Sequence, residues 1–294
     1  MTAFSITGTL TEPARRIVSL APSLTEILFF LGLESSVAGV TEQCDFPPAA
    51  SQLETIGTFS QPDLERIRAV EADLVMGLDG IHHRSVDKFL EAGIPLVLFN
   101  YRTVDDIFAS MEEVIRIADA EQEGTSRMQA LRNRVSRVQA ATSRCHGPRV
   151  FRLMIDDPII TPSATCYQTD AMRLAGAQTM ALNFEEPYVS VALREIIDFD
   201  PQVIISCGRE ISQEVKPRCR GCQAEAPSCQ REVSRLATQA GWSQTAAAKQ
   251  SNIHAVPCGL LCRPGPRVVD GIEAMADLFT RHEGASFTFE AGAR

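Results

Sequence analysis

The fold is decided by residues 16–26, which read RIVSLAPSLTE. Residues 16–20 form a short apolar run with β-branched side chains, which predicts a strand, and Ala21-Pro22 ends it. Residues 23–26 have the spacing of a capping box, in which Ser23 accepts from a first-turn N–H and Glu26 reaches back. A helix is therefore expected to follow the strand directly. A buried strand that leads into a helix is the first half of a βαβ unit.

The same alternation continues outward from this stretch. Strands are predicted at 37–40, 73–76, 95–99, 149–154, 203–206 and 253–256. Helices are predicted at 63–70, 84–92, 103–118, 169–174, 191–198, 234–248 and 268–282, with one more that starts near 125 or 126 and ends at 147–148. This last helix lies in a polar stretch, 122–144, with Met128, Leu131, Val135 and Val138 at helical spacing. The alternation of strands and helices stops at this helix and restarts after it. This pattern predicts an α/β fold of two Rossmann-like lobes with mainly parallel sheets, joined by the helix. A ligand cleft is expected between the lobes.

The domain boundaries follow from this division. We expect an N-terminal lobe over 15–120, a connecting helix over 121–147, a C-terminal lobe over 148–283 with a cysteine-rich insertion at 209–230, and a tail over 284–294. A weak internal repeat supports two similar lobes. Residues 63–67 and then a strand at 74–76 are matched by residues 192–196 and then a strand at 203–205.

Composition excludes several classes of function. The chain has 294 residues and a net charge of −9, without a clustered basic face, so no nucleic acid partner is expected. Its longest apolar run, 27–33, is too short for membrane insertion. The N-terminus shows no signal peptide, so a cytoplasmic location is expected as written, or a periplasmic one if a leader was removed or the start is misplaced. No nucleophile elbow, P-loop or dinucleotide fingerprint occurs, which argues against an enzyme.

Several motifs occur in an order that resembles one family. They are residues 16–26, Asp45-Phe46-Pro47-Pro48, Ile56-Gly57-Thr58, residues 63–67 and Ala72-Asp73-Leu74-Val75. In this order and spacing the chain resembles the cobalamin- and iron-chelate-binding solute receptors of ABC importers, over about residues 15–282. The resemblance implies two α/β lobes joined by a rigid helix, and a corrinoid or iron-chelate ligand clamped between them without chemistry.

The resemblance also implies site residues. The ligand would be contacted by two aromatic residues, Phe59 and Tyr188, and by two loops. These loops are Asp79 to His83, with both His82 and His83, and Cys258 to Cys262. The family docks onto its ABC importer permease through one acidic residue on each lobe. Glu65 fits the first docking position, whereas Cys262 or Arg263 stands near the second, which puts docking in doubt.

Nine cysteines indicate a second function. Complete internal pairing is impossible with an odd number, and in a reducing compartment such cysteines favour metal binding. Cys219-x-x-Cys222 has the spacing of zinc and iron–sulfur ligands. Cysteines that follow predicted strands or lie in this insertion are the candidate ligands: Cys44, Cys207, Cys219, Cys222, Cys229, Cys258 and Cys262.

Two hypotheses therefore stay open. The first is a non-enzymatic binding protein that captures a corrinoid or iron chelate. The second is a cytosolic metalloprotein that reuses the fold to hold an iron–sulfur cluster or zinc through these thiols. In a hybrid of the two, the thiols would grip the metal of the ligand.

Overall fold

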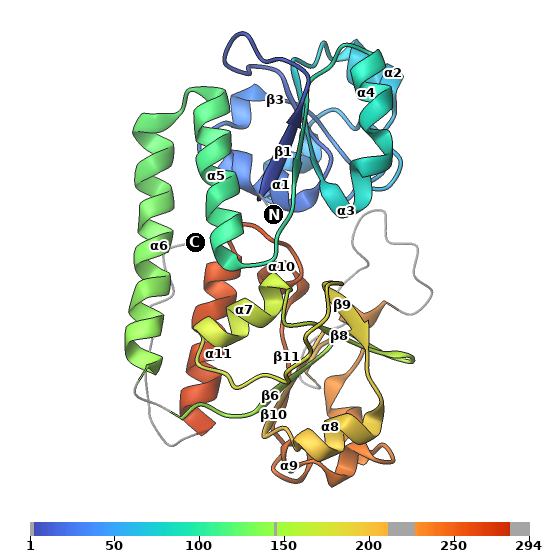
Figure 1. Ribbon diagram of the computed structural model, residues 1–294, viewed down its shortest axis with the longest axis vertical. Coiled ribbons are helices and arrows are strands. Elements are labelled where there is room, and N and C mark those ends of the chain that lie inside the picture. Colours follow the sequence, from blue (N-terminus) through green and yellow to red (C-terminus); the bar gives the residue numbers. More distant parts are fainter. Residues whose placement is uncertain (1–2, 144–145, 211–226, 283–294) are drawn as a thin grey trace. The chain divides into compact units, whose positions relative to one another are not determined.

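The computed structural model describes residues 3–143, 146–210 and 227–282 (Figure 1). The chain divides into two compact units. Unit 1 holds the described residues up to Tyr101 together with Asp105–Leu131, and unit 2 holds Arg102–Val104 and the described residues from Arg132 onward. The last boundary falls inside helix α6 (Glu121–Thr142), which therefore contributes its first half to unit 1 and its second half to unit 2.

Unit 1 is built on a five-stranded sheet with the order β1-β5-β4-β2-β3. Its strands are β1 (Phe4–Thr7), β2 (Ile17–Ser19), β3 (Val37–Val40), β4 (Leu74–Leu78) and β5 (Leu96–Phe99). Four of them run parallel, and β1 pairs antiparallel with β5, Phe4 facing Phe99. Strand β1 was not predicted from the sequence. A four-residue edge strand with two exposed members has little local pattern typical of a strand, and its formation depends on the partner strand.

Helices connect and cover this sheet. They are α1 (Pro22–Phe30), α2 (Leu64–Ala69), α3 (Asp79–His82), α4 (Val86–Glu91) and α5 (Val104–Ala118). Val18, Val75 and Leu98 of the sheet pack in one core cluster with Ile67 of α2 and Phe89 of α4. Figure 1 shows α5 on the other side of the sheet from α2 and α4. Coverage of both faces explains why the strands are apolar throughout.

The predicted capping box at residues 23–26 is wrong. The N-cap residue of α1 is Ala21, and no side chain caps the helix. Pro22 takes the first helical position, where its missing N–H costs nothing and its fixed φ suits the helix. Ser23 is therefore already inside the helix and cannot serve as its cap.

Unit 2 contains two three-stranded sheets. The parallel sheet has the order β11-β10-β6 and the antiparallel sheet the order β7-β8-β9. The strands are β6 (Val150–Leu153), β7 (Ile155–Asp156), β8 (Ile159–Pro162), β9 (Tyr188–Ser190), β10 (Val203–Ser206) and β11 (Ile253–Ala255). The helices are α7 (Tyr167–Leu174), α8 (Leu193–Phe199), α9 (Ala246–Lys249), α10 (Cys258–Leu261) and α11 (Val268–His282). The antiparallel sheet was not predicted, but the α/β class with mainly parallel sheets is confirmed.

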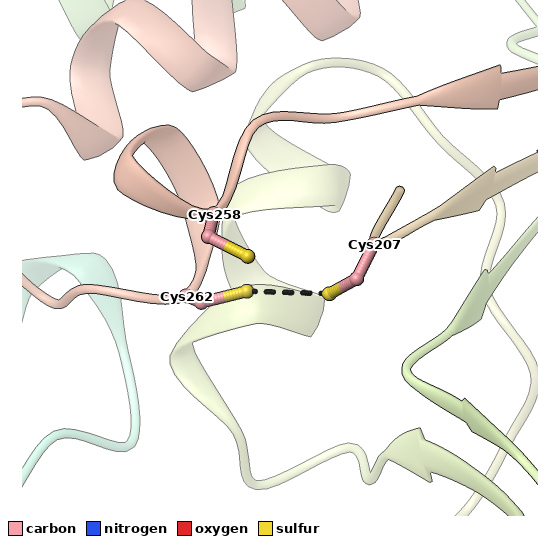
Figure 2. Close-up of side chains that lie close together, drawn as sticks. All are labelled: Cys207, Cys258 and Cys262. Atoms are coloured by element: carbon pink, nitrogen blue, oxygen red, sulfur yellow. Dashed lines mark hydrogen bonds between the residues drawn. The ribbon is translucent and has the colours of Figure 1, made fainter. Parts of the chain in front are cut away.

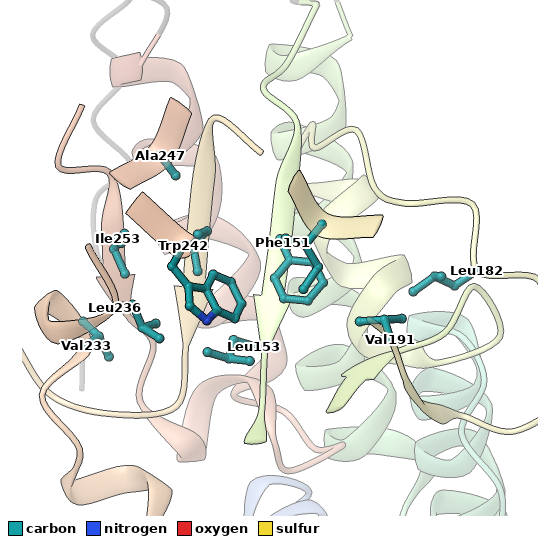
Figure 3. Close-up of a cluster of buried hydrophobic side chains, with 11 residues drawn as sticks. Phe151, Leu153, Leu182, Val191, Val233, Leu236, Trp242, Ala247 and Ile253 are labelled. Carbon is teal, nitrogen blue, oxygen red and sulfur yellow. The ribbon is translucent and has the colours of Figure 1, made fainter. Parts of the chain in front are cut away.

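The helix predicted over 234–248 is also wrong. The chain forms three short pieces there, 3₁₀ turns at Val233–Thr238 and Trp242–Gln244 and then α9. Gly241 lies between them at φ 84°, and a side chain there would lie 2.5 Å from Leu193. The break turns Trp242 into the core of unit 2, where its ring lies 6.0 Å from that of Phe151 (Figure 3).

Helix α6 is anchored within each unit by an arginine. In unit 1, Arg127 donates to the carbonyl of Phe30 over 2.8 Å. In unit 2, Arg134 binds Asp270 and Glu273 of α11, each with a contact of 2.6 Å. The four apolar residues that the helical spacing predicted are all buried along α6, and the polar Thr142 at its end is buried as well. Among the described residues, no helix has the length and apolar character needed to cross a membrane.

Candidate functional site

Three cysteines meet at the carboxyl edge of the parallel sheet of unit 2. Cys207 directly follows β10, and its N–H donates to the carbonyl of Leu153 over 3.3 Å. Both Cys258 and Cys262 follow β11. Cys258 begins the single turn of α10 and Cys262 caps it, with the N–H of Cys262 donating to the carbonyl of Cys258 over 2.8 Å. β10 and β11 are neighbours and parallel, so their carboxyl ends bring the thiols together (Figure 2).

The three sulfur atoms form one compact group. All three Sγ atoms lie within 4.8 Å of one another, and those of Cys207 and Cys262 are 3.5 Å apart. Cys207 is buried, while Cys258 and Cys262 are half-buried and retain access to solvent. Within the described part of the chain, no other set of three histidine, cysteine or acidic side chains is this close.

A buried arginine faces these thiols. Arg152 lies in β6 beside β10 and is only 1% exposed. Its Nη2 donates to the Sγ of Cys207 over 3.0 Å and lies 3.3 Å from that of Cys262. The pKa of Cys207 is lowered because the neighbouring thiols of Cys258 and Cys262 donate to its sulfur and because the positive charge of Arg152 lies beside it. The pKa values of Cys258 and Cys262 are raised, since each donates to Cys207.

A second layer of polar groups surrounds the cluster. Cys166, at the N-terminus of α7, is buried, and its thiol hydrogen-bonds with the hydroxyl of Tyr188. Burial raises the pKa of Cys166. The side chain of Gln168 donates to Tyr188 over 3.4 Å, and Tyr167 donates to the carbonyl of Leu261 over 2.9 Å. These bonds tie α7 and α10 together around the thiols and leave part of Tyr188 exposed.

In the predicted ligand loop of unit 1, His82 contacts the backbone of Phe59 and Leu78. This side chain is buried, and its Nε2 donates to the carbonyl of Phe59 over 2.7 Å. Its Nδ1 accepts from the N–H of Leu78 over 2.9 Å, so both ring nitrogens are engaged by backbone groups. Burial lowers the pKa of His82, and these hydrogen bonds partly offset that effect. The ring of Phe59 meets that of His82 edge to face at 5.5 Å.

His83 and Asp79 lie on the outside of the same loop. Nδ1 of His83 lies 3.3 Å from Oδ1 of Asp79, and both side chains are exposed. Glu65, on α2, is 80% exposed and pairs with Arg68 over 2.8 Å. These three side chains are therefore accessible from solvent.

The other predicted metal ligands are not members of the thiol cluster. Cys44 belongs to unit 1, where it is buried and accepts from Thr25 Oγ1 over 3.1 Å. Cys229 is half-buried in unit 2 and is not part of the group of three. Cys219 and Cys222 fall outside the described residues, as does most of the insertion predicted at 209–230 and the tail.

The sequence missed Arg152. An arginine in the middle of an apolar run, Val150-Phe151-Arg152-Leu153, was the available signal. A strand with both faces covered leaves no exposed position for a charge, so such an arginine needs a buried anionic partner.

Two α/β units with polar, thiol and aromatic side chains at the carboxyl ends of parallel strands define the class of α/β ligand-binding proteins. Comparison with family models gives the family. Residues 17–257 match the model described as periplasmic binding protein, so the chain belongs to this family. Its members are the substrate-binding components of ABC importers. The resemblance to the cobalamin- and iron-chelate-binding receptors is confirmed.

Individual relatives agree with this assignment. The vitamin B12-binding protein of Vibrio parahaemolyticus is 26% identical over 204 residues, which cover 69% of this chain and 74% of the relative. The crystal structure of the periplasmic vitamin B12 binding protein of Vibrio cholerae superposes with a TM-score of 0.76 at 23% identity, covering 93% of this chain and 99% of the other. A periplasmic haem-binding protein from Roseiflexus sp. RS-1 gives a TM-score of 0.75 at 20% identity, with coverages of 92% and 99%.

These relatives are binding proteins and not enzymes. The cytosolic iron–sulfur protein that the cysteine count suggested finds no support in the comparisons.

Proposed function

We propose that this protein captures a corrinoid, haem or iron-chelate ligand and delivers it to an ABC importer. Family membership carries this proposal, together with the vitamin B12- and haem-binding relatives. Capture requires binding without turnover, which agrees with a family of carriers. The same membership supports a site of action in the periplasm, which fractionation of the producing cells tests.

Exposed aromatic and apolar side chains support a large ligand with flat apolar faces. Unit 1 exposes Phe46 and Ile81, on segments that follow β3 and β4. Unit 2 exposes Phe184 and Tyr188. Removing large apolar groups from water is favourable, and the faces of a tetrapyrrole can cover them. Among the predicted aromatic ligand contacts, Tyr188 is one of these exposed side chains, whereas Phe59 is half-buried.

Binding can be tested with three coloured probes, namely cyanocobalamin, haemin and a ferric catecholate chelate. We expect one of them to bind with a Kd in the micromolar range or below, seen as a shift of its visible absorbance. The variant Phe59→Ala/Tyr188→Ala is expected to weaken that binding at least ten-fold. Leu90→Ala is the matched control, since it removes an exposed apolar side chain from α4. If none of the three probes binds, the proposal is wrong.

Delivery to an importer assigns a separate role to Glu65. Its carboxylate is exposed, and a surface ion pair such as that with Arg68 contributes little to stability. A cationic surface of the importer can therefore replace Arg68 as the partner of this carboxylate. Glu65→Gln should leave probe binding unchanged and reduce stimulation of the importer ATPase in proteoliposomes. Unchanged stimulation would remove Glu65 from the docking surface.

A further inference from the structure

The thiol cluster of unit 2 has the composition of a metal site that does not depend on the proposed ligand. Cys207 directly follows β10, Cys258 is the first residue of α10, and Cys262 is the C-cap residue of α10. Residues four apart on a helical turn lie on the same side of it, which places both thiols of α10 toward Cys207 (Figure 2). Two rigid elements thus hold three soft ligands around one point.

The sulfur spacing suits direct coordination. Three thiolates at about 2.3 Å from one ion lie about 3.8 to 4.0 Å apart in tetrahedral or trigonal geometry. The observed separations are 3.5 Å between Cys207 and Cys262, and no more than 4.8 Å for any pair. The upper bound of 4.8 Å exceeds the coordinating separation by about 1 Å, so the three sulfur atoms already lie near a coordinating arrangement.

Arg152 provides the charge that such a site needs. Its guanidinium is buried and contacts Cys207 and Cys262 through Nη2, while its Nε and Nη1 have no hydrogen-bond partner among the described residues. A buried charge is costly unless an opposite charge accompanies it. Three thiolates and one divalent ion carry a net charge of −1, which the guanidinium cancels. A monovalent or trivalent ion would leave a buried net charge.

We propose that Cys207, Cys258 and Cys262 bind one soft divalent metal ion as a three-thiolate site that Arg152 neutralises. Thiolates select soft ions over Mg²⁺ and Ca²⁺, which prefer oxygen ligands. Access for the ion is through the half-buried Cys258 and Cys262. Their exposure also leaves room for a fourth ligand from solvent or from a bound molecule.

The test is titration of the reduced, anaerobic full-length protein with Cd²⁺ alone. Sulfur-to-cadmium charge transfer in the ultraviolet reports the number of thiolates, and calorimetry gives the affinity. Two sets of variants separate this cluster from the other cysteines. Cys219→Ser/Cys222→Ser/Cys229→Ser keeps all three members, whereas Cys258→Ser and Cys262→Ser, each added to this triple variant, remove one member.

We expect the triple variant to bind one Cd²⁺ with the charge-transfer intensity of three thiolates. Each single variant is expected to lose about a third of that intensity and to bind at least ten-fold more weakly. Circular dichroism checks that each variant is folded, and Cys44→Ala in unit 1 is a control for loss of an unrelated buried thiol. Absence of Cd²⁺ binding in the triple variant would overturn the proposal, and so would unchanged binding in Cys258→Ser and Cys262→Ser. Because the assay contains no tetrapyrrole or chelate, its outcome is independent of the proposed function.

Discussion

The Nη2 atom of Arg152 donates a hydrogen bond to the Sγ atom of Cys207 over 3.0 Å, between neighbouring strands of the parallel sheet of unit 2. Arginine has no acceptor atoms and stays protonated, so each of its hydrogen-bond partners in the interior must be an acceptor. Here that acceptor is sulfur. The positive charge of Arg152 therefore influences whether the thiols of unit 2 are protonated and whether they bind a metal ion.

Replacement of Arg152 separates stability from binding. In Arg152→Met the thiols can remain protonated, so no unpaired buried charge is left behind. We expect the free energy of unfolding to stay within about 1.5 kcal/mol of the parent, since apolar replacement of buried ionic groups is often neutral or stabilising. The affinity for Cd²⁺ is expected to fall at least ten-fold. Denaturant unfolding and calorimetry measure the two quantities.

Arg149→Met is the matched control for this variant. Arg149 precedes β6, and its Nη2 donates to the carbonyl of Asp200 over 2.6 Å, away from the thiols. Its loss should reduce stability and leave the affinity for Cd²⁺ unchanged. If Arg152→Met instead unfolds readily and binds Cd²⁺ as the parent does, the arginine serves the fold alone.

Stability should decrease in mildly acidic solution because of His82. Its pKa is lowered by burial, from an ordinary value of 6.5. Above that value the side chain is neutral in both the folded and the unfolded state. As the pH falls below 6.5, the unfolded state takes up a proton that the folded state resists, so the free energy of unfolding falls. Urea midpoints measured from pH 8 to pH 5 by circular dichroism check this expectation.

The contribution of His82 is isolated by difference. Burial also lowers the pKa of His254, so the parent profile contains both histidines. His82→Gln should show a flatter profile below pH 6.5 than the parent. His83→Gln is the control, because that side chain is 77% exposed. Identical profiles for the parent and His82→Gln would refute the assignment.

The cap of α2 supports the segment that carries Glu65. Oδ1 of Asp63 accepts from the N–H groups of Glu65 and Arg66 over 3.0 and 3.1 Å. Asp63→Ala leaves both donors without this acceptor, and we expect a loss of about 0.5 to 2 kcal/mol in unfolding free energy. Asp63→Asn keeps an acceptor oxygen and should lose much less. Equal losses for the two variants would show that the carboxylate charge, and not the cap, is what matters.

Much of the fold could be predicted because its main signals are local. Buried parallel strands read as short apolar runs, so β2, β4, β5 and β10 were found close to their observed bounds. Elements that depend on a distant partner were missed, such as β1, which needs β5, and β8, which needs β7 and β9. The false helix over 234–248 has helix-forming residues, but packing of Trp242 in the core overrides their preference.

The candidate site, like the fold, could be predicted only in part. Cys207, Cys258 and Cys262 could be grouped because the carboxyl ends of neighbouring parallel strands meet. Cys44 was grouped with them by the same rule, although it follows a strand of the other sheet, because the rule does not say to which sheet a strand belongs. Arg152 was missed because local pattern assigns a charge to the surface, and only the tertiary arrangement shows its sulfur partners.

The burial of Trp242 provides an optical reporter. The chain has a single tryptophan, and it lies against Phe151 in the core of unit 2. Its fluorescence therefore follows the integrity of that unit alone, whereas the amide signal of circular dichroism averages over the whole chain. If the two signals change at different denaturant concentrations, the units melt separately, and if they coincide, the units unfold as one cooperative block.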